Sequence, residues 1–362
     1  MSRSKAVAIA PINRDFVSIP SNNLSADTSV DLADSSVFGS YFQSNTPTLA
    51  SWDVSTTAIL KDVAGYTASI RKATTSSERQ SVLTFREGWW ESEDEYSLWD
   101  YSGSVVLEDG NGEIDVEDIE EIDYLHGRVK FKDYEVVGQL TATHHYYDTV
   151  KICDVDNLDL NMSSNIEDMT DFCYAQDNEG YRNWAYTQLN VSLSLGGFDR
   201  DITEFMTDVG RDLSIIEISL DKNKGSVARG YFTSVNQQFD GWFIRRRTIE
   251  YELHQHDIKV KPFSWKHKDS SLPESIRWVI DAWENRKALK IRYIPIRENL
   301  AIAGDVLVAQ CGISVAVDGI PTFDIDFQGV GMRDDDSRYT FLADFVNQEY
   351  QLGSIQPYLV AS

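Results

Sequence analysis

Basic residues are scarce in this sequence. Of its 362 residues, 33 are Lys or Arg and 58 are Asp or Glu, so the formal net charge is −25. A protein that wraps nucleic acid needs a basic footprint, and this composition argues against that class. The charge is also uneven, because residues 91–180 hold 25 acids and 4 bases, a net charge of −21. Such acidity is compatible with a surface that repels nucleic acid.

Long hydrophobic runs are absent and cysteines are few. No run of about 18 apolar residues occurs, which argues against a membrane span. The apolar run AVAIA near the N-terminus is too short for a secretory signal, so we expect a protein made in the cytoplasm. Cys153, Cys173 and Cys311 cannot all pair and form no C-x-x-C motif. We expect free thiols in a reducing compartment.

Catalytic and metal-binding motifs are missing too. The sequence has no G-x-S-x-G, P-loop, dinucleotide fingerprint or H-E-x-x-H. Residues 109–120 place oxygen ligands at several positions of a calcium loop, but Ile114 stands where glycine is needed. His254 and His256 share a face of a predicted strand, without a third ligand at a matching spacing. We therefore predict no enzyme activity, no cofactor and no metal.

What the sequence does contain is alternation of apolar and polar residues. From Phe323 to Gln328 the order Phe, Asp, Ile, Asp, Phe, Gln is typical of a strand with one buried face. Similar alternation recurs at 66–73, 127–147 and 189–198. The sequence therefore predicts a mainly β fold.

Two segments have helical periodicity instead. Apolar residues fall at i, i+3, i+4 and i+7 both in 201–210 and in 275–284. Asp201 and Glu204 have the spacing of a capping box, and Pro273 stands just before the second segment. We predict two short α-helices, 74 residues apart.

The same offset relates the strands that follow each predicted helix. Residues 248–253 align without a gap to 322–327, and 215–220 match 289–294 after a one-residue slip. Alternating patterns also match by chance in β-rich chains, so coincidence stays open beside an internal duplication. The predicted organisation is an extended N-terminal arm at 1–56, a β-rich acidic segment at 57–150 that completes the second module, a first module at 151–260, a second module at 261–345 that repeats 200–257, and a C-terminal tail at 346–362.

This order of parts resembles the major tail tube proteins of long-tailed, siphovirus-like bacteriophages. VDNLDLNMSS is similar to the first strand of their module, SLSLGGF to the end of the next strand, and DITEFMTDVG to the helix. The C-terminal segment up to FDIDFQGVG is similar to the closing strands, with the aromatic-x-x-x-aromatic-x-G pattern. The resemblance covers somewhat more than half of the chain. The acidic insert at 108–123 and the N-terminal arm are not part of the minimal module.

The resemblance implies two tail-tube-like β-sandwich or barrel modules, interleaved in one chain. It also implies a structural virion protein, made in the host cytoplasm, that self-assembles into stacked hexameric rings. The rings form a channel for DNA ejection, through which DNA passes without specific binding. Other expected partners are the tape measure and tail-end proteins, with no membrane. Alternatives are another β-rich virion component, such as a distal tail or decoration protein, or a carbohydrate-binding β-sandwich module.

Two sets of residues are candidates for roles in such a tube. Carboxylates that line the channel would repel phosphate, although a solvated outer loop fits the acidic cluster at 115–123 equally well. The paired aromatic residues could stack on a sugar or base, but packing at a module or subunit contact is favoured. The candidate channel acids are Asp115, Glu117, Asp118, Glu120, Glu121, Asp123, Asp324 and Asp326, and the candidate packing or assembly aromatics are Trp89, Trp90, Tyr146 and Tyr147.

Overall fold

The chain is mainly β wherever the structure, a computed structural model, describes it. The mainly β prediction is therefore confirmed, and the helix predicted at 275–284 is α3 (Glu274–Glu284). The helix predicted at 201–210 and the tail at 346–362 lie outside the described residues. No helix within the described ranges is long and apolar enough to cross a membrane. The described residues are 6–12, 14–34, 45–60, 67–154, 157–171, 173, 181–198, 214–219, 226–240, 246–254, 260–267, 272–294, 302–315 and 320–334.

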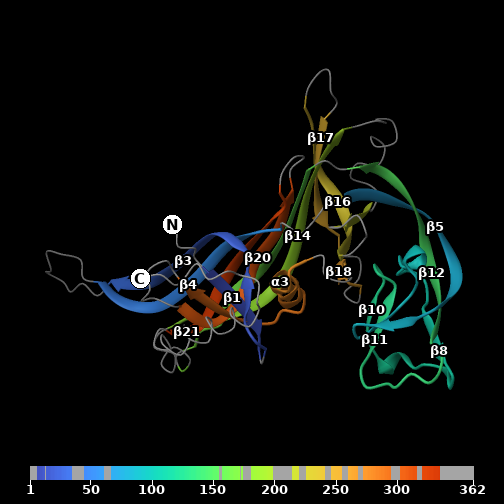
Figure 1. Ribbon diagram of the computed structural model, residues 1–362, viewed down its shortest axis with the longest axis horizontal. Coiled ribbons are helices and arrows are strands. Elements are labelled where there is room, and N and C mark those ends of the chain that lie inside the picture. The colour runs from blue at the N-terminus through green and yellow to red at the C-terminus, as the bar shows by residue number, and fades with distance from the viewer. Residues whose placement is uncertain are drawn as a thin grey trace, which may run out of the picture.

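Eight antiparallel strands, which we call the main sheet, follow one another in the order β16, β17, β14, β13, β20, β21, β4, β3. Figure 1 shows them from β16 and β17 at the top to β3 and β4 at the left. Their bounds are β16 Ser226–Asp240, β17 Arg246–Leu253, β14 Trp184–Phe198, β13 Asn157–Asp168, β20 Ile302–Val315, β21 Thr322–Asp334, β4 Asn45–Ile59 and β3 Ser21–Asp34.

Alternation along these strands gives the main sheet one apolar face. Leu160, Ile249 and Ile325 point into a single hydrophobic core that also contains Ile276 and Ile280 of α3. Successive side chains of a strand point to opposite faces, so the polar residues between them lie on the other face. The helix therefore covers one side of the main sheet, and the polar side faces away from it.

A second layer covers the same core. It contains β1 (Ala6–Pro11), β2 (Val17–Ile19), β15 (Ser214–Ser219), β18 (Phe263–His267) and β19 (Leu289–Ile294). Strand β19 pairs with β1 and with the first part of β20, while β15 and β18 pair with the two edges of the first part of β16. The core lies between this layer and the main sheet.

The N-terminal residues differ from the predicted extended arm. Residues from Ala6 to Ile59 supply four strands of the sheet, and Val7 and Ile9 are fully buried. Ser25, Asp27, Asp53 and Ser55 lie on the polar face, while Leu24, Trp52 and Thr56 are buried on the core side. Half-buried strands can therefore have a composition that we read as an arm without a core.

One four-strand arrangement occurs twice in the main sheet. The order β16, β17, β14, β13 matches the order β20, β21, β4, β3. Both long strands carry a bulge at the matching place, at Val235 in β16 and at Ala309 in β20, 74 residues apart. A second pair of matching register shifts follows Ser164 in β13 and Val30 in β3. Such bulges are specific local features, and their recurrence aligns the two groups residue by residue.

In the last strand of the repeat, this alignment differs from the one predicted from sequence. Asn236 pairs with Glu250, and the equivalent Gln310 pairs with Asp326. The offset there is 76 rather than 74, because the connection from β20 to β21 is two residues longer. The strands completing the second group also differ from the prediction for 57–150, since β3 and β4 pair with β21 and with each other.

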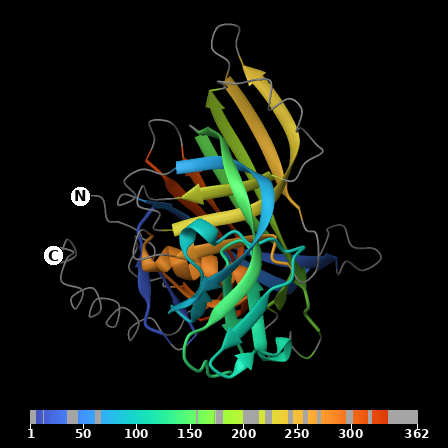
Figure 2. The same ribbon diagram turned by 90° about the vertical axis from the view of Figure 1, so that its right-hand side faces the viewer.

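Residues 57–150 instead form most of a separate hairpin that carries a small lobe. Strands β5 (Thr67–Val82) and β12 (Thr141–Asp154) pair with each other, and β5 also pairs with β15. The small lobe, residues 83–140, lies between them in sequence and has its own core around Trp99. Figures 1 and 2 show it beside the main body, in front of α3 in the second view. Its elements are β6 Thr84–Arg86, β7 Trp89–Glu91, β8 Val106–Asp109, β9 Gly112–Glu113, β10 Ile119–Asp123, β11 Arg128–Phe131 and 3-10 helices at Asp94–Tyr96 and Val116–Asp118.

The glycine of the aromatic-x-x-x-aromatic-x-G pattern has a packing role. A Cβ atom at Gly329 would lie 2.1 Å from an atom of the Trp52 ring. Trp52 is buried beneath the sheet and donates a hydrogen bond from Nε1 to the carbonyl oxygen of Gly331 (3.1 Å). Glycine at position 329 thus lets β21 approach this indole closely.

Candidate functional site

The outer face of the main sheet is largely polar, and we call it the acidic face. The registers place directly opposite residues on the same side of the sheet, from Glu250 through Ser194 and Asp159 to Ser314. By register, the apolar side chains of Leu307 and Val330 also lie on this side. The described polar side chains of this face include Thr233, Asn236 and Gln238 of β16, Thr248, Glu250 and Glu252 of β17, Asn190, Ser192 and Ser194 of β14, Asp159, Asn161 and Ser163 of β13, Gln310 and Ser314 of β20, Thr322, Asp324, Asp326 and Gln328 of β21, Ser51, Asp53, Ser55 and Thr57 of β4, and Asn23, Ser25, Asp27 and Ser29 of β3.

Seven carboxylates and no Lys or Arg occur among these described side chains. Arg246, at the start of β17, is not among the residues whose side chains the structure describes. The acids are therefore surrounded by hydroxyl and amide groups, which bear no charge. The seven are Asp27, Asp53, Asp159, Glu250, Glu252, Asp324 and Asp326.

Within the described residues, hydroxyl and amide groups hydrogen-bond to the carboxylates of this face. Thr57 donates from Oγ1 to Oδ1 of Asp324 (2.7 Å), and Ser314 donates from Oγ to Oδ1 of Asp159 (2.9 Å). Within the described part of the chain, none of the seven carboxylates forms an ion pair. Hydroxyl donors orient a carboxylate without neutralising it, so the face keeps its negative charge.

The pKa of Asp53 reflects the negative charge of its neighbours on the acidic face. Asp53 lies directly opposite Asp27 of β3. It is diagonal to Asp326 of β21, because Asp326 lies opposite Ser55, two residues along β4 from Asp53. Partial burial, followed by the negative charges of Asp27 and Asp326, raises the pKa of Asp53 above its usual value. Like charges that disfavour each other's ionisation are a sign of concentrated, uncompensated charge.

The predicted channel acids separate into two groups. Asp324 and Asp326 lie on the acidic face together with five other carboxylates. The cluster at 115–123 lies instead in the small lobe, which belongs to a different part of the molecule. Whether either group lines a channel stays a prediction.

Within the small lobe these acids have different surroundings. Glu120 pairs with Lys130 and Glu121 pairs with Lys261, both at 2.8 Å. Asp115 caps the 3-10 helix by accepting a hydrogen bond from the backbone N–H of Glu117 (3.1 Å). The exposed or half-buried members are Asp115, Glu117, Asp118, Glu120 and Glu121.

Asp123 does not fit its predicted role as a channel acid. Its side chain is 1% exposed, and its Oδ2 atom lies 2.8 Å from Nε of Arg128. Ser264 of β18 donates to the same oxygen (2.6 Å). An acid that is buried and paired in this way presents no charge to a solvent-filled channel.

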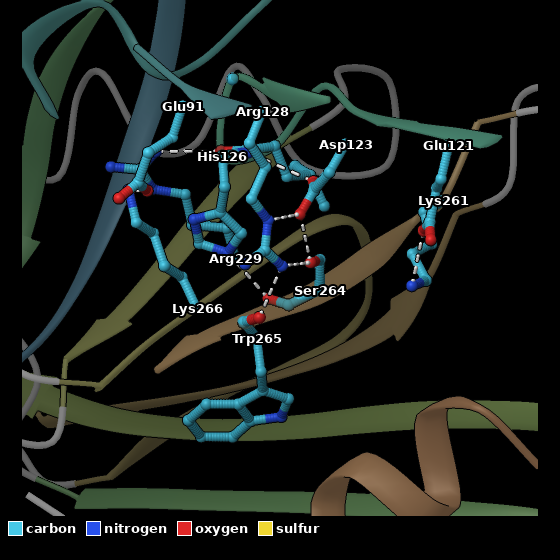
Figure 3. Close-up of polar contacts among 12 residues, drawn as sticks. Glu91, Glu121, Asp123, His126, Arg128, Arg229, Lys261, Ser264, Trp265 and Lys266 are labelled. Carbon is cyan, nitrogen blue, oxygen red and sulfur yellow. Dashed lines mark hydrogen bonds and ion pairs between the residues drawn. The ribbon is translucent and has the colours of Figure 1, made fainter. Parts of the chain in front are cut away.

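Asp123 is the centre of a buried polar joint between the small lobe and β18 (Figure 3). Arg128 also donates from Nη2 to the carbonyl oxygen of Trp265 (2.8 Å), and His126 lies 3.0 Å from the carbonyl oxygen of Ser264 through Nε2. Burial alone would raise the pKa of Asp123, but Arg128 and the hydroxyl of Ser264 hold it well below its usual value. Burial lowers the pKa of His126, and its Nε2–H donates because a carbonyl oxygen can only accept. These contacts anchor the lobe to the body.

Further ion pairs cross or flank the same joint. Lys266 of β18 pairs with Glu91 of β7, with side chains that are 7% and 9% exposed. Arg229 of β16 pairs with Glu217 of β15 (2.7 Å) and donates to the carbonyl oxygen of Leu125 in the small lobe (2.9 Å). Buried charges in this region are thus paired, as the cost of desolvation requires, and the Lys266–Glu91 pair joins the small lobe to β18.

A cleft of about 1260 Å³ opens beside this joint, between the small lobe, β18 and α3. Glu284 lines it and accepts a hydrogen bond from the backbone N–H of Trp265 (3.2 Å). The side chain keeps some accessible surface, yet protein atoms crowd its carboxyl group. Burial, opposed by the charge of Lys261, raises the pKa of Glu284 to about 7. The cleft is lined by charges of both signs, so it favours no single class of ligand.

The four predicted aromatics make contacts within the chain. The Trp89 ring lies under the guanidinium of Arg128, 4.4 Å from its centroid, and Trp90 packs into the small-lobe core. Tyr146 meets Tyr96 edge to face at 5.1 Å. Tyr147 lies at the joint between lobe and body, and its hydroxyl donates to Asp100 (2.6 Å). These contacts support packing within the subunit.

The metal motifs considered from sequence have other contacts here. Asp109, the first residue of the calcium-like loop, accepts hydrogen bonds from Tyr134 (3.0 Å) and from the backbone N–H groups of Asn111 and Val137. His254 contacts Thr233 (3.1 Å), and His256 lies outside the described residues. Among the residues that the structure covers, no group of three or more His, Cys, Asp or Glu is arranged to hold a metal.

Sequence reasoning missed most of the acidic face. Asp27, Asp53, Asp159, Glu250 and Glu252 each stand in an alternating strand, so the period-2 pattern could have assigned each one to the wet side. It could not show that β3, β4, β13 and β17 bring them together with Asp324 and Asp326 of β21. A scan of protein-family models finds no match to this chain, and a search of curated proteins finds no significant relative.

Proposed function

We propose that this chain is a structural subunit of a phage tail tube, which self-assembles into stacked rings whose channel conducts DNA. The observation that carries the proposal is the acidic face, a largely polar surface across eight strands with seven carboxylates and no Lys or Arg among the polar side chains named above. An inert, negatively charged sheet is what the wall of a DNA channel requires. In this role the protein resides in the virion and contacts other tail proteins.

Electrostatics explains why such a face suits a DNA channel. Duplex DNA is densely charged and binds wherever Lys or Arg can release its counterions. Carboxylates that lack ion pairs repel phosphate over a distance of about 8 Å at physiological salt. Serine, threonine and asparagine between them offer only weak, exchangeable hydrogen bonds. DNA would therefore slide along the wall without adhering to it.

Both ends of the acidic face support assembly. The outer edge of β3 and the edge of β16 beyond Phe232 have no strand partner within the described residues. Unpaired strand edges are rarely left open in soluble proteins, and closing them in a ring removes them. A ring that joins the two edges would also continue the acidic face from one subunit to the next.

The repeat changes the expected number of subunits. The resemblance implies a ring of six modules, and the chain contains two four-strand groups of the same order. Three chains would therefore supply six groups. We propose a trimeric ring with approximate sixfold symmetry in place of the hexamer expected from the resemblance alone.

Electron microscopy of negatively stained, purified protein tests this function. The proposal expects rings or tubes with an open channel, and a ring mass of three chains. A triple variant of acidic-face residues away from the outer edge of β3, Asp53→Lys, Asp324→Lys and Asp326→Lys, should still assemble but retain duplex DNA that wild-type tubes release. A matched triple of exposed small-lobe acids, Asp115→Lys, Glu117→Lys and Asp133→Lys, should not retain DNA inside the channel. A persistent monomer at high concentration would contradict the proposal.

A further inference from the structure

The main sheet contains an internal joint between its two four-strand groups. Strand β13, the last of the first group, pairs antiparallel with β20, the first of the second group. The register places Asp159 opposite Ser314, Asn161 opposite Gly312 and Ser163 opposite Gln310. This joint shows how the end of one group meets the beginning of the next.

Among the described residues, the same two kinds of edge have no strand partner at the two ends of the main sheet. Strand β3 is equivalent to β13, and the matching register shifts place Val30 at the position of Ser164, 134 residues apart. Strand β16 is equivalent to β20, and the matching bulges place Val235 at the position of Ala309. Each of these two edges thus has a structural counterpart that is already paired inside the molecule.

We propose that the edge of β3 in one copy pairs antiparallel with the edge of β16 in a second copy, in the register of the internal joint. Transferring the two offsets places Ser29 opposite Asn236 and Asp27 opposite Gln238 of the neighbouring copy. The inference rests on the proposed function, because it names the partner and the residues that close the ring. It specifies one register among those that two bare edges could adopt.

The residue types at the transferred positions are compatible with this register. Ser29 opposite Asn236 repeats the hydroxyl–amide pair of Ser163 and Gln310 in the internal joint. Asp27 would face an uncharged amide, so no two like charges are directly opposite at this contact. Residues 24–29 of β3 and 232–240 of β16 contain no proline, lysine or arginine, the residues that commonly prevent edge pairing.

Two exposed valines provide an independent observation. In the internal joint, Ser164 donates from Oγ to the carbonyl oxygens of Val308 (2.7 Å) and Ala309 (3.1 Å), so these residues touch. The transferred register brings Val30 to Val235 in the same way. Val30 is 48% exposed and Val235 is 52% exposed in the single chain. The proposed contact would cover both apolar side chains at once.

One position requires a wider spacing than the internal joint. A Cβ atom at Gly312 would lie 2.7 Å from the carbonyl oxygen of Leu160, and Gln238 occupies the equivalent place in β16. The two strands must therefore separate slightly at Gln238. For this reason the test uses Ser29 and Asn236, whose internal equivalents both have side chains.

Disulfide trapping tests the register directly. The double variant Ser29→Cys/Asn236→Cys is made in a Cys153→Ser/Cys173→Ser background, which leaves only the buried Cys311. Opposite residues of an antiparallel pair are close enough for a disulfide, whereas a two-residue shift places them about 7–8 Å apart. The matched controls are Ser163→Cys/Gln310→Cys, which should close within one chain, and Ser29→Cys/Gln238→Cys, which is out of register.

The expected result is a ladder of covalent dimers and higher oligomers for Ser29→Cys/Asn236→Cys on mild oxidation, with at least a tenfold lower yield for the out-of-register pair. If the internal control closes and rings are visible, but Ser29→Cys/Asn236→Cys does not cross-link, the inference fails while the proposed function stands. A covalent ladder without rings would support the edge pairing and contradict the proposed ring. Failure of both cross-linking and assembly would overturn both.

A second variant tests the contact without cysteine chemistry. Val235→Glu should reduce the assembled fraction at least tenfold and leave the circular dichroism and melting curve of the subunit unchanged. Val116→Glu is the matched control, because Val116 is an exposed valine (75%) in the small lobe, and it should assemble as wild type. Equal assembly of Val235→Glu and Val116→Glu would overturn the proposed contact.

Discussion

Carboxylate side chains have opposite roles on the acidic face and at the buried joint. On the acidic face, Asp324 accepts a hydrogen bond from a threonine hydroxyl and remains exposed. At the joint, Asp123 is buried and is neutralised by Arg128 at 2.8 Å. The first arrangement keeps charge available to solvent, and the second uses charge to fix two parts of the chain to each other. The density of acids along the sequence therefore does not reveal where the negative surface lies.

The largest expected effect is the difference in stability between a substitution on the buried face of the main sheet and one on the acidic face. Ile325 is 1% exposed in the core, and its neighbour Asp324 is exposed on the acidic face. Ile325→Asp would bury an unpaired carboxylate, so we expect a loss of at least about 4 kcal/mol in the free energy of unfolding, or no folded protein. Asp324→Ser should change it by no more than about 0.5 kcal/mol. Urea unfolding of both variants measures this difference, and native stability of Ile325→Asp would show that the strand register is wrong.

Breaking the buried joint should have the next largest effect. Arg128→Ala leaves Asp123 buried without its cation, and we expect a loss of about 3–5 kcal/mol. The control is Lys130→Ala on the same strand, because the Lys130–Glu120 pair is 40% and 44% exposed and should contribute about 1 kcal/mol or less. Denaturant unfolding gives both values. Equal losses would mean that burial does not distinguish these ion pairs.

The joint should also depend on pH. The pKa of Glu284 is raised to about 7, so its protonated form is favoured by the folded state. This contribution is fully present below the unfolded value of about 4.3 and is lost as the pH rises through 7. Between pH 5 and 8 the melting temperature of the wild type should therefore fall more than that of Glu284→Gln. Asp281→Asn, an exposed change on the same helix, should keep the wild-type slope; identical slopes for all three proteins would contradict the assignment.

The smallest expected effect concerns repulsion on the acidic face. Since neighbouring negative charges raise the pKa of Asp53, Asp53→Asn should stabilise the folded subunit at pH 7 by about 0.5 kcal/mol. Added salt should reduce this gain by screening the repulsion. Thermal unfolding at low and high salt measures both quantities. Asp133→Asn, an exposed small-lobe control, should cause no such change, and a destabilised Asp53→Asn would indicate that Asp53 has a cationic partner.

Local pattern in the sequence was sufficient for individual elements. The alternation from Phe323 to Gln328 correctly predicted a strand with Ile325 inside and Asp324 outside, and the apolar spacing correctly predicted α3. Both are decided by neighbours within a few residues, which is where periodicity carries information. The helix predicted at 201–210 lies outside the described residues, and the tube function stays a proposal.

The pairing of residues far apart in the chain could not be predicted from the sequence. Asp324 meets Thr57 across 267 positions, and Ser264 meets Asp123 across 141. Nothing in the alternation of β3 and β4 indicates that they complete the group ending in β21, because many registers bury the same apolar residues. The acidic segment was misleading for the same reason, since the basic partner of Glu121 lies far along the chain at Lys261.

Electron cryomicroscopy of the assembled wild-type protein is the most direct test of the claim that the acidic face lines a channel. The structure should show β3 of each subunit joined to β16 of the next, with Asp27, Asp53 and Asp326 facing the axis and α3 outside the wall. Rings whose channel is lined by the small lobe, with the acidic face turned outward, would contradict it.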